Sequence, residues 1–271
     1  MRNPLIINPQ KEKNKIVSFL KKTFQEQKIN KAVIGLSGGI DSAVAFYLLK
    51  KVLPLKNIFA YHLPYTETSN DIKFPSENFQ IIPIKKIVDK LIDGWHEFKG
   101  SRQRGVEGNL SRANPGGKKT RDRTHQIRIG NIMARTRMII LFDQAKRHKA
   151  LVCGTENKSE HLLGYFTRFG DSASDIEPIT HLYKTQVYQL AKYLKIPEEI
   201  IQAKPTAGLW ENQTDEGEFG FTYEEADQVL YLFHDRNKSL NEIINLGFKN
   251  AEKIIQRVKQ NEFKRKTPYT I

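Results

Sequence analysis

The sequence predicts an α/β protein with a doubly wound parallel sheet, helices on both faces and a C-terminal helical extension. Short apolar runs that end at Ser, Pro or Gly alternate along the chain with segments whose apolar residues recur at helical spacing. Strands that alternate with helices form parallel sheets covered on both faces. The expected strands are residues 31–37, 58–63, 79–84 and 150–155.

Apolar residues at helical spacing predict the helices. The first has Ile16, Phe19, Leu20 and Phe24 on one face. Right-handed crossovers between parallel strands place ligands at the carboxyl ends of the strands, so we expect the site in the loops that follow them. The other expected helices are residues 43–53, 84–95, 131–146, 185–194 and 196–203, with 223–234, 240–246 and 250–262 forming the C-terminal extension.

Length and composition restrict the class of protein. The 271 residues fit one larger α/β domain, so a single domain over residues 1–271 is expected. One cysteine excludes an intramolecular disulfide, a four-cysteine zinc site and a two-thiol redox cycle. The longest apolar run, residues 138–142, is far shorter than the roughly 20 residues that span a bilayer, and the first residues contain no secretory hydrophobic segment. We therefore expect a cytoplasmic protein without membrane contact.

The net charge of +14 favours phosphate-rich partners such as nucleotides or nucleic acid. Half of this excess lies in residues 99–128, which contain five glycines and no aromatic residue. Nucleic-acid binding by stacking needs interleaved aromatics, so this stretch is expected to be a mobile basic surface loop. Residues 207–220 are acidic and punctuated by glycines, and we expect them to form a lid in which Trp210 and Phe219 cover the site.

Residues 35–42, Gly-Leu-Ser-Gly-Gly-Ile-Asp-Ser, follow an expected buried strand and open a helix. Small residues there let phosphate oxygens approach successive backbone N–H groups and the helix N-terminus. The lysine-bearing phosphate loop of ordinary nucleotide hydrolases is absent, because Asp41 stands where a cation is expected. An aspartate beside a polyphosphate indicates a metal between them, so Asp41 is a candidate Mg²⁺ ligand. The alternative is that Asp41 only caps the helix.

The string SGGIDS at residues 37–42 resembles that of the N-type ATP pyrophosphatases, which cleave ATP between the α and β phosphates and adenylate a substrate. Further strings resemble the NAD synthetases within that group and extend the resemblance from Ala32 to Tyr223. This resemblance implies a Rossmann-like fold of the adenine nucleotide alpha hydrolase-like type. The strings are GNIMARTRM at 130–138, CGTENKSE at 153–160, LGYFTRFGD at 163–171, DIEP at 175–178, KPTAGLW at 204–210 and QTDE at 213–216.

The resemblance implies a ligase that uses ATP and ammonia to amidate deamido-NAD to NAD, through an acyl adenylate with release of AMP and pyrophosphate. Mg²⁺ would be the cofactor, held by Asp41 and Glu160, and ATP the co-substrate. Asp171 and Lys184 would be catalytic, Asp171 by accepting a proton from ammonium and Lys184 beside the ATP phosphates. By itself, Glu160 is better explained as an ordinary helix position, whereas the motif around Lys184 argues against a merely solvated lysine at a helix start. The implied ATP-binding residues are Gly35, Leu36, Ser37, Gly38, Gly39, Ile40, Asp41, Ser42, Thr155, Lys184 and Thr206, and those for deamido-NAD are Arg135, Arg168, Asp175 and Lys264.

Three features depart from the family pattern. Arg168 stands where the family often has lysine, Phe263 replaces the histidine that often precedes Lys264, and the segment after Tyr65 is short, which bears on adenine binding. The family builds its deamido-NAD site across a two-fold interface, and helix 131–146 is apolar around much of its circumference, so a homodimer is expected. The alternative is that the C-terminal helices of the same chain cover these residues.

Free ammonia is the expected amine source, because a fused glutaminase needs a nucleophilic cysteine and the only cysteine, Cys153, lies in an expected buried strand. Supply by a separate glutaminase is equally compatible with the sequence. Two alternative functions would each account for one feature of the sequence. An ATP pyrophosphatase that modifies tRNA would account for the charge, although sulfur-inserting members need catalytic thiols. A non-catalytic nucleotide-binding relative would account for the shortened adenine region.

Overall fold

A computed structural model describes residues 4–66, 76–102, 118–206 and 213–270. Its sheet has four parallel strands in the order β3-β2-β1-β4, formed by Ala32–Gly35 (β1), Ile58–His62 (β2), Asn78–Ile81 (β3) and Leu151–Cys153 (β4). Ala32 lies opposite Ile58 on one side and Leu151 on the other, and Phe59 pairs with Asn78. The predicted parallel sheet is confirmed, and each strand is shorter than the apolar run that predicted it.

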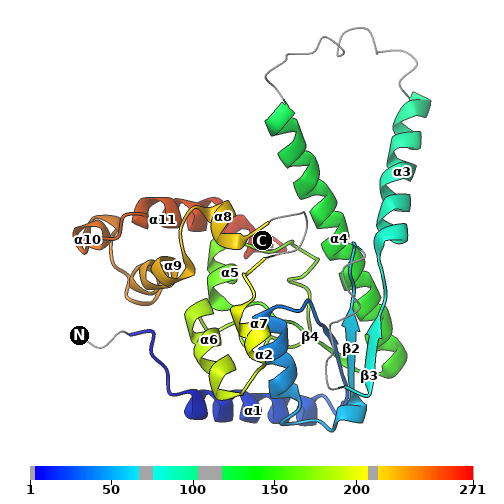
Figure 1. The fold of residues 1–271 in the computed structure, drawn as a ribbon, viewed down its shortest axis with the longest axis horizontal. Coiled ribbons are helices and arrows are strands. Elements are labelled where there is room, and N and C mark those ends of the chain that lie inside the picture. The colour runs from blue at the N-terminus through cyan, green and yellow to red at the C-terminus, as the bar shows by residue number, and fades with distance from the viewer. Residues whose placement is uncertain (1–3, 67–75, 103–117, 207–212, 271) are drawn as a thin grey trace.

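Helices cover both faces of the sheet (Figure 1). On one face lie α1 (Pro9–Glu26), α2 (Ile40–Leu49), α6 (Lys184–Tyr193) and α7 (Glu198–Gln202). Asn8 and Pro9 begin α1, because the Asn8 side chain accepts the Lys11 N–H and proline fits the first helical turn. A short 3₁₀ turn, Leu55–Asn57, precedes β2. The doubly wound arrangement is therefore the one that the sequence predicted.

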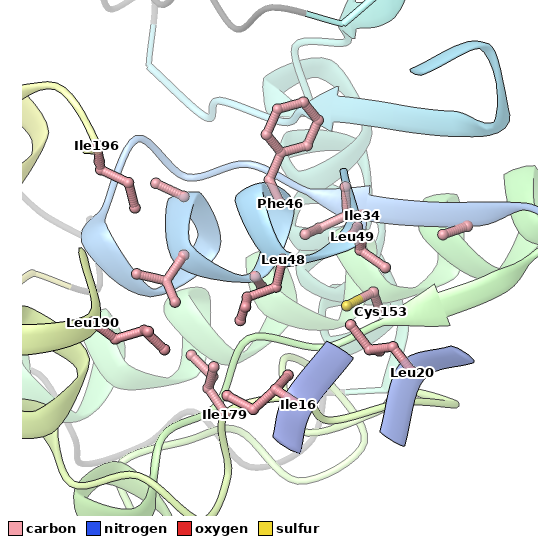
Figure 2. Packing of buried hydrophobic residues seen from close by; sticks show 14 of the residues in the cluster. Ile16, Leu20, Ile34, Phe46, Leu48, Leu49, Cys153, Ile179, Leu190 and Ile196 are labelled. Carbon is pink, nitrogen blue, oxygen red and sulfur yellow. The ribbon is translucent and has the colours of Figure 1, made fainter. Parts of the chain in front are cut away.

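The hydrophobic core on this face joins α1, α2 and α6 to the sheet. Figure 2 shows Ile16 and Leu20 of α1 facing Leu48 of α2, with Cys153 of β4 and Leu190 of α6 in the same cluster. All five are buried. Burying one leucine or isoleucine side chain contributes roughly 1.5–3 kcal/mol, so this cluster fixes the carboxyl ends of the strands relative to α2 and α6.

The other face is covered by α3 (Lys85–Arg102) and α4 (Lys118–His148). Val33 of β1 points to this side and packs with Val88 of α3 and Met133 of α4. Figure 1 shows that both helices continue well past the sheet. Each is longer than the sequence predicted, since the apolar pattern marks only the part of a helix that packs against the core.

The expectation of a basic loop over residues 99–128 is wrong at both of its ends. Residues 99–102 belong to α3 and residues 118–128 to α4, while 103–117 lie outside the described residues. The basic part of α4 lacks an apolar face, yet Lys, Arg and Gln are good helix formers and extend the packed segment that follows. The basic charge of these residues therefore does not prevent a helix here.

The C-terminal extension is present but does not pack on the sheet. Its hydrophobic cluster contains Leu163, Phe219, Val229 and Ile254, and no strand residue among the described part of the chain belongs to it. It rests on α5 (Lys158–Leu163), which the sequence analysis did not predict, and on α6. Its elements are α8 (Asp215–Phe219), α9 (Tyr223–Leu230) continued by a π turn (Tyr231–Asp235), α10 (Leu240–Asn245), α11 (Ala251–Gln260) and a 3₁₀ turn (Glu262–Lys264).

The expected lid over residues 207–220 is wrong in its second half. Residues 215–219 form α8, capped by the Thr214 hydroxyl, which accepts the Gly217 N–H. Phe219 is only 2% exposed and packs edge to face against Tyr165, so it belongs to the core and is not available to cover a ligand. The other expected cover, Trp210, lies outside the described residues.

The apolar residues of α4 are mostly covered within the same chain. Met133 is buried, and Ile132, Ile140, Leu141 and Phe142 pack against the cluster between α4 and the sheet. The cover therefore comes from the sheet and α3 rather than from the C-terminal helices. Apolar side chains that remain exposed on this side are Ile87, Leu91, Ile127 and Ile139.

No helix in the described ranges is long and apolar enough to cross a membrane.

Candidate active site

The loop after β1 has the geometry that its glycines and serines predicted. Gly38 has a φ of +89°, a left-handed conformation that glycine adopts without strain. The Ser37 hydroxyl accepts the Gly39 N–H at 3.1 Å, and the Ser42 hydroxyl donates to the Gly39 carbonyl at 3.0 Å. Ile40 is the first residue of α2, so the loop presents a helix N-terminus at the carboxyl edge of the sheet. Backbone N–H groups at such a terminus bind anions.

Lys184 joins two carboxylates beside this loop. Its ammonium group donates to Asp41 Oδ2 at 2.5 Å and to Glu160 Oε1 at 3.1 Å. These side chains come from the first turns of α6, α2 and α5, which meet at this point. The Lys184 side chain is only 3% exposed, whereas those of Asp41 and Glu160 are 16% and 17% exposed. The structure thus brings Lys184 together with the two carboxylates that were predicted as a pair, and the lysine is the most buried of the three.

The electrostatics of this cluster follow from burial and from charge. Burial alone would lower the pKa of Lys184, but attraction by Asp41 and Glu160 more than offsets it and keeps the ammonium group charged. Burial and the neighbouring charge of Asp41 raise the pKa of Glu160, against the attraction of Lys184. Two carboxylates and one lysine leave a net negative charge when all are ionised. The arrangement therefore accommodates additional positive charge.

Asn157 belongs to the same cluster and was missed as a site residue. Its side chain is fully buried, its amide donates to Asp41 Oδ1 at 3.0 Å, and its carbonyl oxygen accepts the Glu160 N–H. Asn157 is the N-cap of α5, so it orients the Asp41 carboxylate and begins the helix that carries Glu160. The sequence carried a signal for this role, because asparagine followed three residues later by glutamate is typical of a helix start.

Asp171 lies in the turn that follows α5, opposite α4. Its Oδ1 accepts the Thr167 N–H at 2.9 Å, and the Thr167 hydroxyl donates to Asn131 of α4 at 2.8 Å. The protein packed around Asp171 raises its pKa, although the side chain still reaches solvent. Such a carboxylate can accept a proton from a reactant that approaches from solvent.

The residues expected to bind deamido-NAD are spread along this side of the site. The exposed Arg135 donates to the Arg168 carbonyl at 3.2 Å, and the Arg168 guanidinium lies over the Phe263 ring, 5.1 Å from its centroid. Phe263, noted as a departure, therefore supports Arg168. Asp175 is exposed, and one of its oxygens accepts the Val152 N–H at 2.8 Å.

The ammonium group of Lys264, which was expected to bind deamido-NAD, is hydrogen-bonded to the protein itself. It donates to the Gly164 carbonyl at 2.7 Å and to the Phe166 carbonyl at 3.0 Å. It ties the chain end to the turn that leads to Arg168. Thr155 follows β4 and is half-buried, whereas Thr206 is exposed after α7. The structure therefore brings Thr155 to the strand edge, and Thr206 follows Pro205, whose carbonyl accepts the Asp215 N–H at 3.0 Å.

Glu177 is a further carboxylate that the sequence analysis did not single out. It accepts hydrogen bonds from the Ser174 hydroxyl at 2.7 Å and from the Glu156 N–H at 3.2 Å. Its carboxylate fills the space beside Gly154, where an added Cβ would come within 1.8 Å of Oε1. Burial raises the pKa of Glu177 to about 7. Glu177 thereby braces the loop that carries Thr155.

We expect Glu177→Gln to stabilise the protein at pH 8 and to have little effect at pH 5. A carboxyl whose pKa rises from 4.5 to about 7 on folding binds more protons in the folded state, so its ionisation lowers stability as pH rises through this window. The gain should be about 3 kcal/mol at pH 8, measured by urea unfolding at both pH values. The exposed Glu252→Gln is the control, and an equal effect of the two variants at pH 8 would contradict the burial argument.

Backbone N–H groups and a lysine held between two carboxylates make this edge of the sheet suited to a nucleoside polyphosphate. The fold and the site thus define a nucleotide-binding α/β protein. A model of the family described as NAD synthase matches residues 12–268. The chain belongs to the NAD synthase family.

Individual relatives agree with this assignment. An NH(3)-dependent NAD(+) synthetase of Fusobacterium nucleatum is 40% identical to this chain, and the aligned region covers 98% of this chain and 97% of that relative. The solved NMN synthetase of Francisella tularensis has a TM-score of 0.75 and 30% identity, and covers 98% of this chain and 99% of its own. The NH3-dependent NAD synthetase of Campylobacter jejuni has a TM-score of 0.70 and 29% identity, and covers 98% of this chain and 100% of its own.

Proposed function

We propose that this chain is an ammonia-dependent NAD synthetase, a ligase that amidates deamido-NAD with consumption of ATP. The observation that carries the proposal is the bridge from Lys184 to Asp41 and Glu160 directly beside the Ser37–Ser42 loop. A cation at this point would oppose the negative charge that the leaving pyrophosphate gains. Near-full-length similarity to ammonia-dependent relatives supports the same conclusion.

The first step joins the two substrates. A carboxylate oxygen of deamido-NAD attacks the α-phosphorus of ATP, the bond from that phosphorus to the β-phosphate oxygen breaks, and pyrophosphate leaves. Backbone N–H groups at the start of α2 and the Lys184 ammonium group bind the departing oxygens. Arg135 and Arg168 hold the anionic groups of deamido-NAD on the opposite side, and Thr155 contacts the nucleotide at the end of β4.

The second step forms the amide. Ammonia attacks the acyl carbon, the bond from that carbon to the phosphate oxygen breaks, AMP leaves, and the attacking nitrogen loses a proton to the departing phosphate or to solvent to give the amide. Asp171 binds ammonium and accepts the proton that must be lost before attack. The exposed side chain of Asp171 is reachable by ammonia from solvent, which supports free ammonia as the amine source.

Asp41 and Glu160 fit a Mg²⁺ site. Mg²⁺ is usually held by one or two carboxylates together with phosphate oxygens, and these two partly exposed carboxylates lie on either side of one cation. When bound, the metal would neutralise phosphate charge. Within the described residues no group of three or more His, Cys, Asp or Glu side chains forms a closed metal site, which agrees with a metal that depends on the nucleotide for its remaining ligands.

The experiment that tests the proposal supplies ATP, Mg²⁺, ammonium and either deamido-NAD or nicotinate mononucleotide. We expect NAD and AMP in equal amounts from deamido-NAD, and much slower turnover of the mononucleotide. The second acid is included because the similar Francisella tularensis structure is an NMN synthetase. Absence of both NAD and AMP would refute the proposal. Faster turnover of the mononucleotide would show that the mononucleotide, and not deamido-NAD, is the preferred substrate.

A homodimer in the cytoplasm is also part of the proposal. Exposed Ile87 and Leu91 of α3 and Ile127 and Ile139 of α4 form apolar surface on the long helices, and a second copy of the chain would cover it. Sedimentation at micromolar concentration should give about twice the 31.3 kDa of one chain. A monomer with full activity would show that the interface is not required.

A further inference from the structure

Asp227 links the C-terminal extension to the active site. It lies on α9, is fully buried and accepts two hydrogen bonds, from the Ser159 hydroxyl at 2.5 Å and from the Thr185 N–H at 2.8 Å. The Ser159 oxygen in turn accepts the Lys184 N–H at 2.8 Å. One carboxylate therefore holds two elements of the site, α5 through Ser159 and α6 through its first turn.

The first backbone N–H groups of a helix need partners from outside the helix. In α6 these groups belong to Lys184 and Thr185, and both are satisfied through Asp227, directly or through Ser159. A negative charge at this end of a helix is also favourable for its dipole. A residue 42 positions further along the chain than Thr185 thus provides the N-terminal cap of α6.

The two residues held in this way are immediate neighbours of the charged cluster. Lys184 is itself the first residue of α6, and its side chain reaches Asp41 and Glu160 from that capped turn. Ser159 directly precedes Glu160 on α5. A shift of Asp227 would therefore move the Lys184 backbone and the backbone that carries Glu160 together.

We propose that Asp227 is a positioning residue for the reaction, which sets the distance from the Lys184 ammonium group to Glu160 and Asp41 without contact with substrate. This inference rests on the proposed function of the cluster in binding pyrophosphate. The C-terminal extension then contributes to the reaction indirectly, because it supplies the carboxylate that holds Lys184 and Glu160 in position.

The test compares Asp227→Asn with Asp235→Asn. Asp235 also belongs to the C-terminal extension and contacts the neighbouring residues, Lys158 and Tyr183, but holds neither Ser159 nor the α6 N–H groups. We expect Asp227→Asn to lower kcat about 10²-fold, to weaken ATP binding about tenfold and to leave the KM for deamido-NAD unchanged, since small misplacements of reacting groups have effects of this size. Asp235→Asn should remain within about threefold of wild type in all three.

Two further measurements separate positioning from loss of fold. Ser159→Ala removes the link to the Lys184 N–H, and it should reproduce the change in kcat with circular dichroism and unfolding midpoint near those of wild type. ATP affinity, measured by calorimetry without deamido-NAD, tests the inference even if NAD formation fails in wild type. Wild-type kcat and ATP affinity in a folded Asp227→Asn or Ser159→Ala protein would overturn the inference, as would equal losses in Asp235→Asn.

Discussion

Replacing Lys184 by methionine is expected to lower NAD formation about 10³-fold and to destabilise the protein by about 3–5 kcal/mol. The activity falls because a preorganised cation is removed from the leaving pyrophosphate. The stability falls because Asp41 and Glu160 then face each other without the ammonium group that joins them. NAD formation at saturating substrates and urea unfolding measure the two effects.

Two controls separate these effects. Lys158→Met removes a lysine of the neighbouring helix α5 whose ion pair with Asp235 is more exposed, and it should change stability by about 1 kcal/mol or less and leave activity near wild type. The double variant Lys184→Met with Glu160→Gln removes the repulsion and should recover stability without recovering activity. Activity above a tenth of wild type in folded Lys184→Met would refute the role of the lysine.

Asp171→Asn is expected to lower NAD formation about 10²- to 10⁴-fold while adenylation continues. Asparagine retains the oxygen that accepts the Thr167 N–H, so the turn should keep its geometry, but the amide cannot take a proton from ammonium. Exchange of labelled pyrophosphate into ATP, measured with deamido-NAD and without ammonium, should stay within about threefold of wild type. AMP should then exceed NAD, because the unused acyl adenylate is hydrolysed.

Asp143→Asn is the matched control, since Asp143 is an exposed carboxylate on α4 whose oxygen accepts a hydrogen bond from Gln144. It should leave both reactions unchanged. If Asp171→Asn slows pyrophosphate exchange as much as NAD formation, the carboxylate acts before amide formation, and its assignment to the ammonia step is wrong.

The parallel sheet and the phosphate loop were predictable because their signals are local. A buried strand requires a continuous apolar run, and the loop at residues 35–42 requires small residues next to each other. The resemblance implied a place for Lys184 near the ATP phosphates, but its contact with Asp41, 143 positions away, was not predicted. Their roles in binding and catalysis remain predictions.

Other parts could not be predicted from local pattern. Asp227 and Ser159 are 68 positions apart, and an aspartate within a short amphipathic helix gives no sign that its side chain caps another helix. Phe219 was expected in a lid because of the glycines around it, yet Gly220, with a φ of +69°, ends helix α8. The glycine therefore marks the end of a helix, and the prediction of a lid from it was wrong.

The capping of α6 by α9 has a consequence for how the protein is made. Synthesis proceeds from the N-terminus, so the loop at residues 35–42, the strands and Lys184 all leave the ribosome before Asp227 does. Until α9 has folded against α5 and α6, the first turn of α6 lacks its cap and the lysine has no fixed place between the two carboxylates. A nascent chain therefore cannot complete the cluster of Lys184, Asp41 and Glu160 early, and this cluster takes its final form only when α9 has docked.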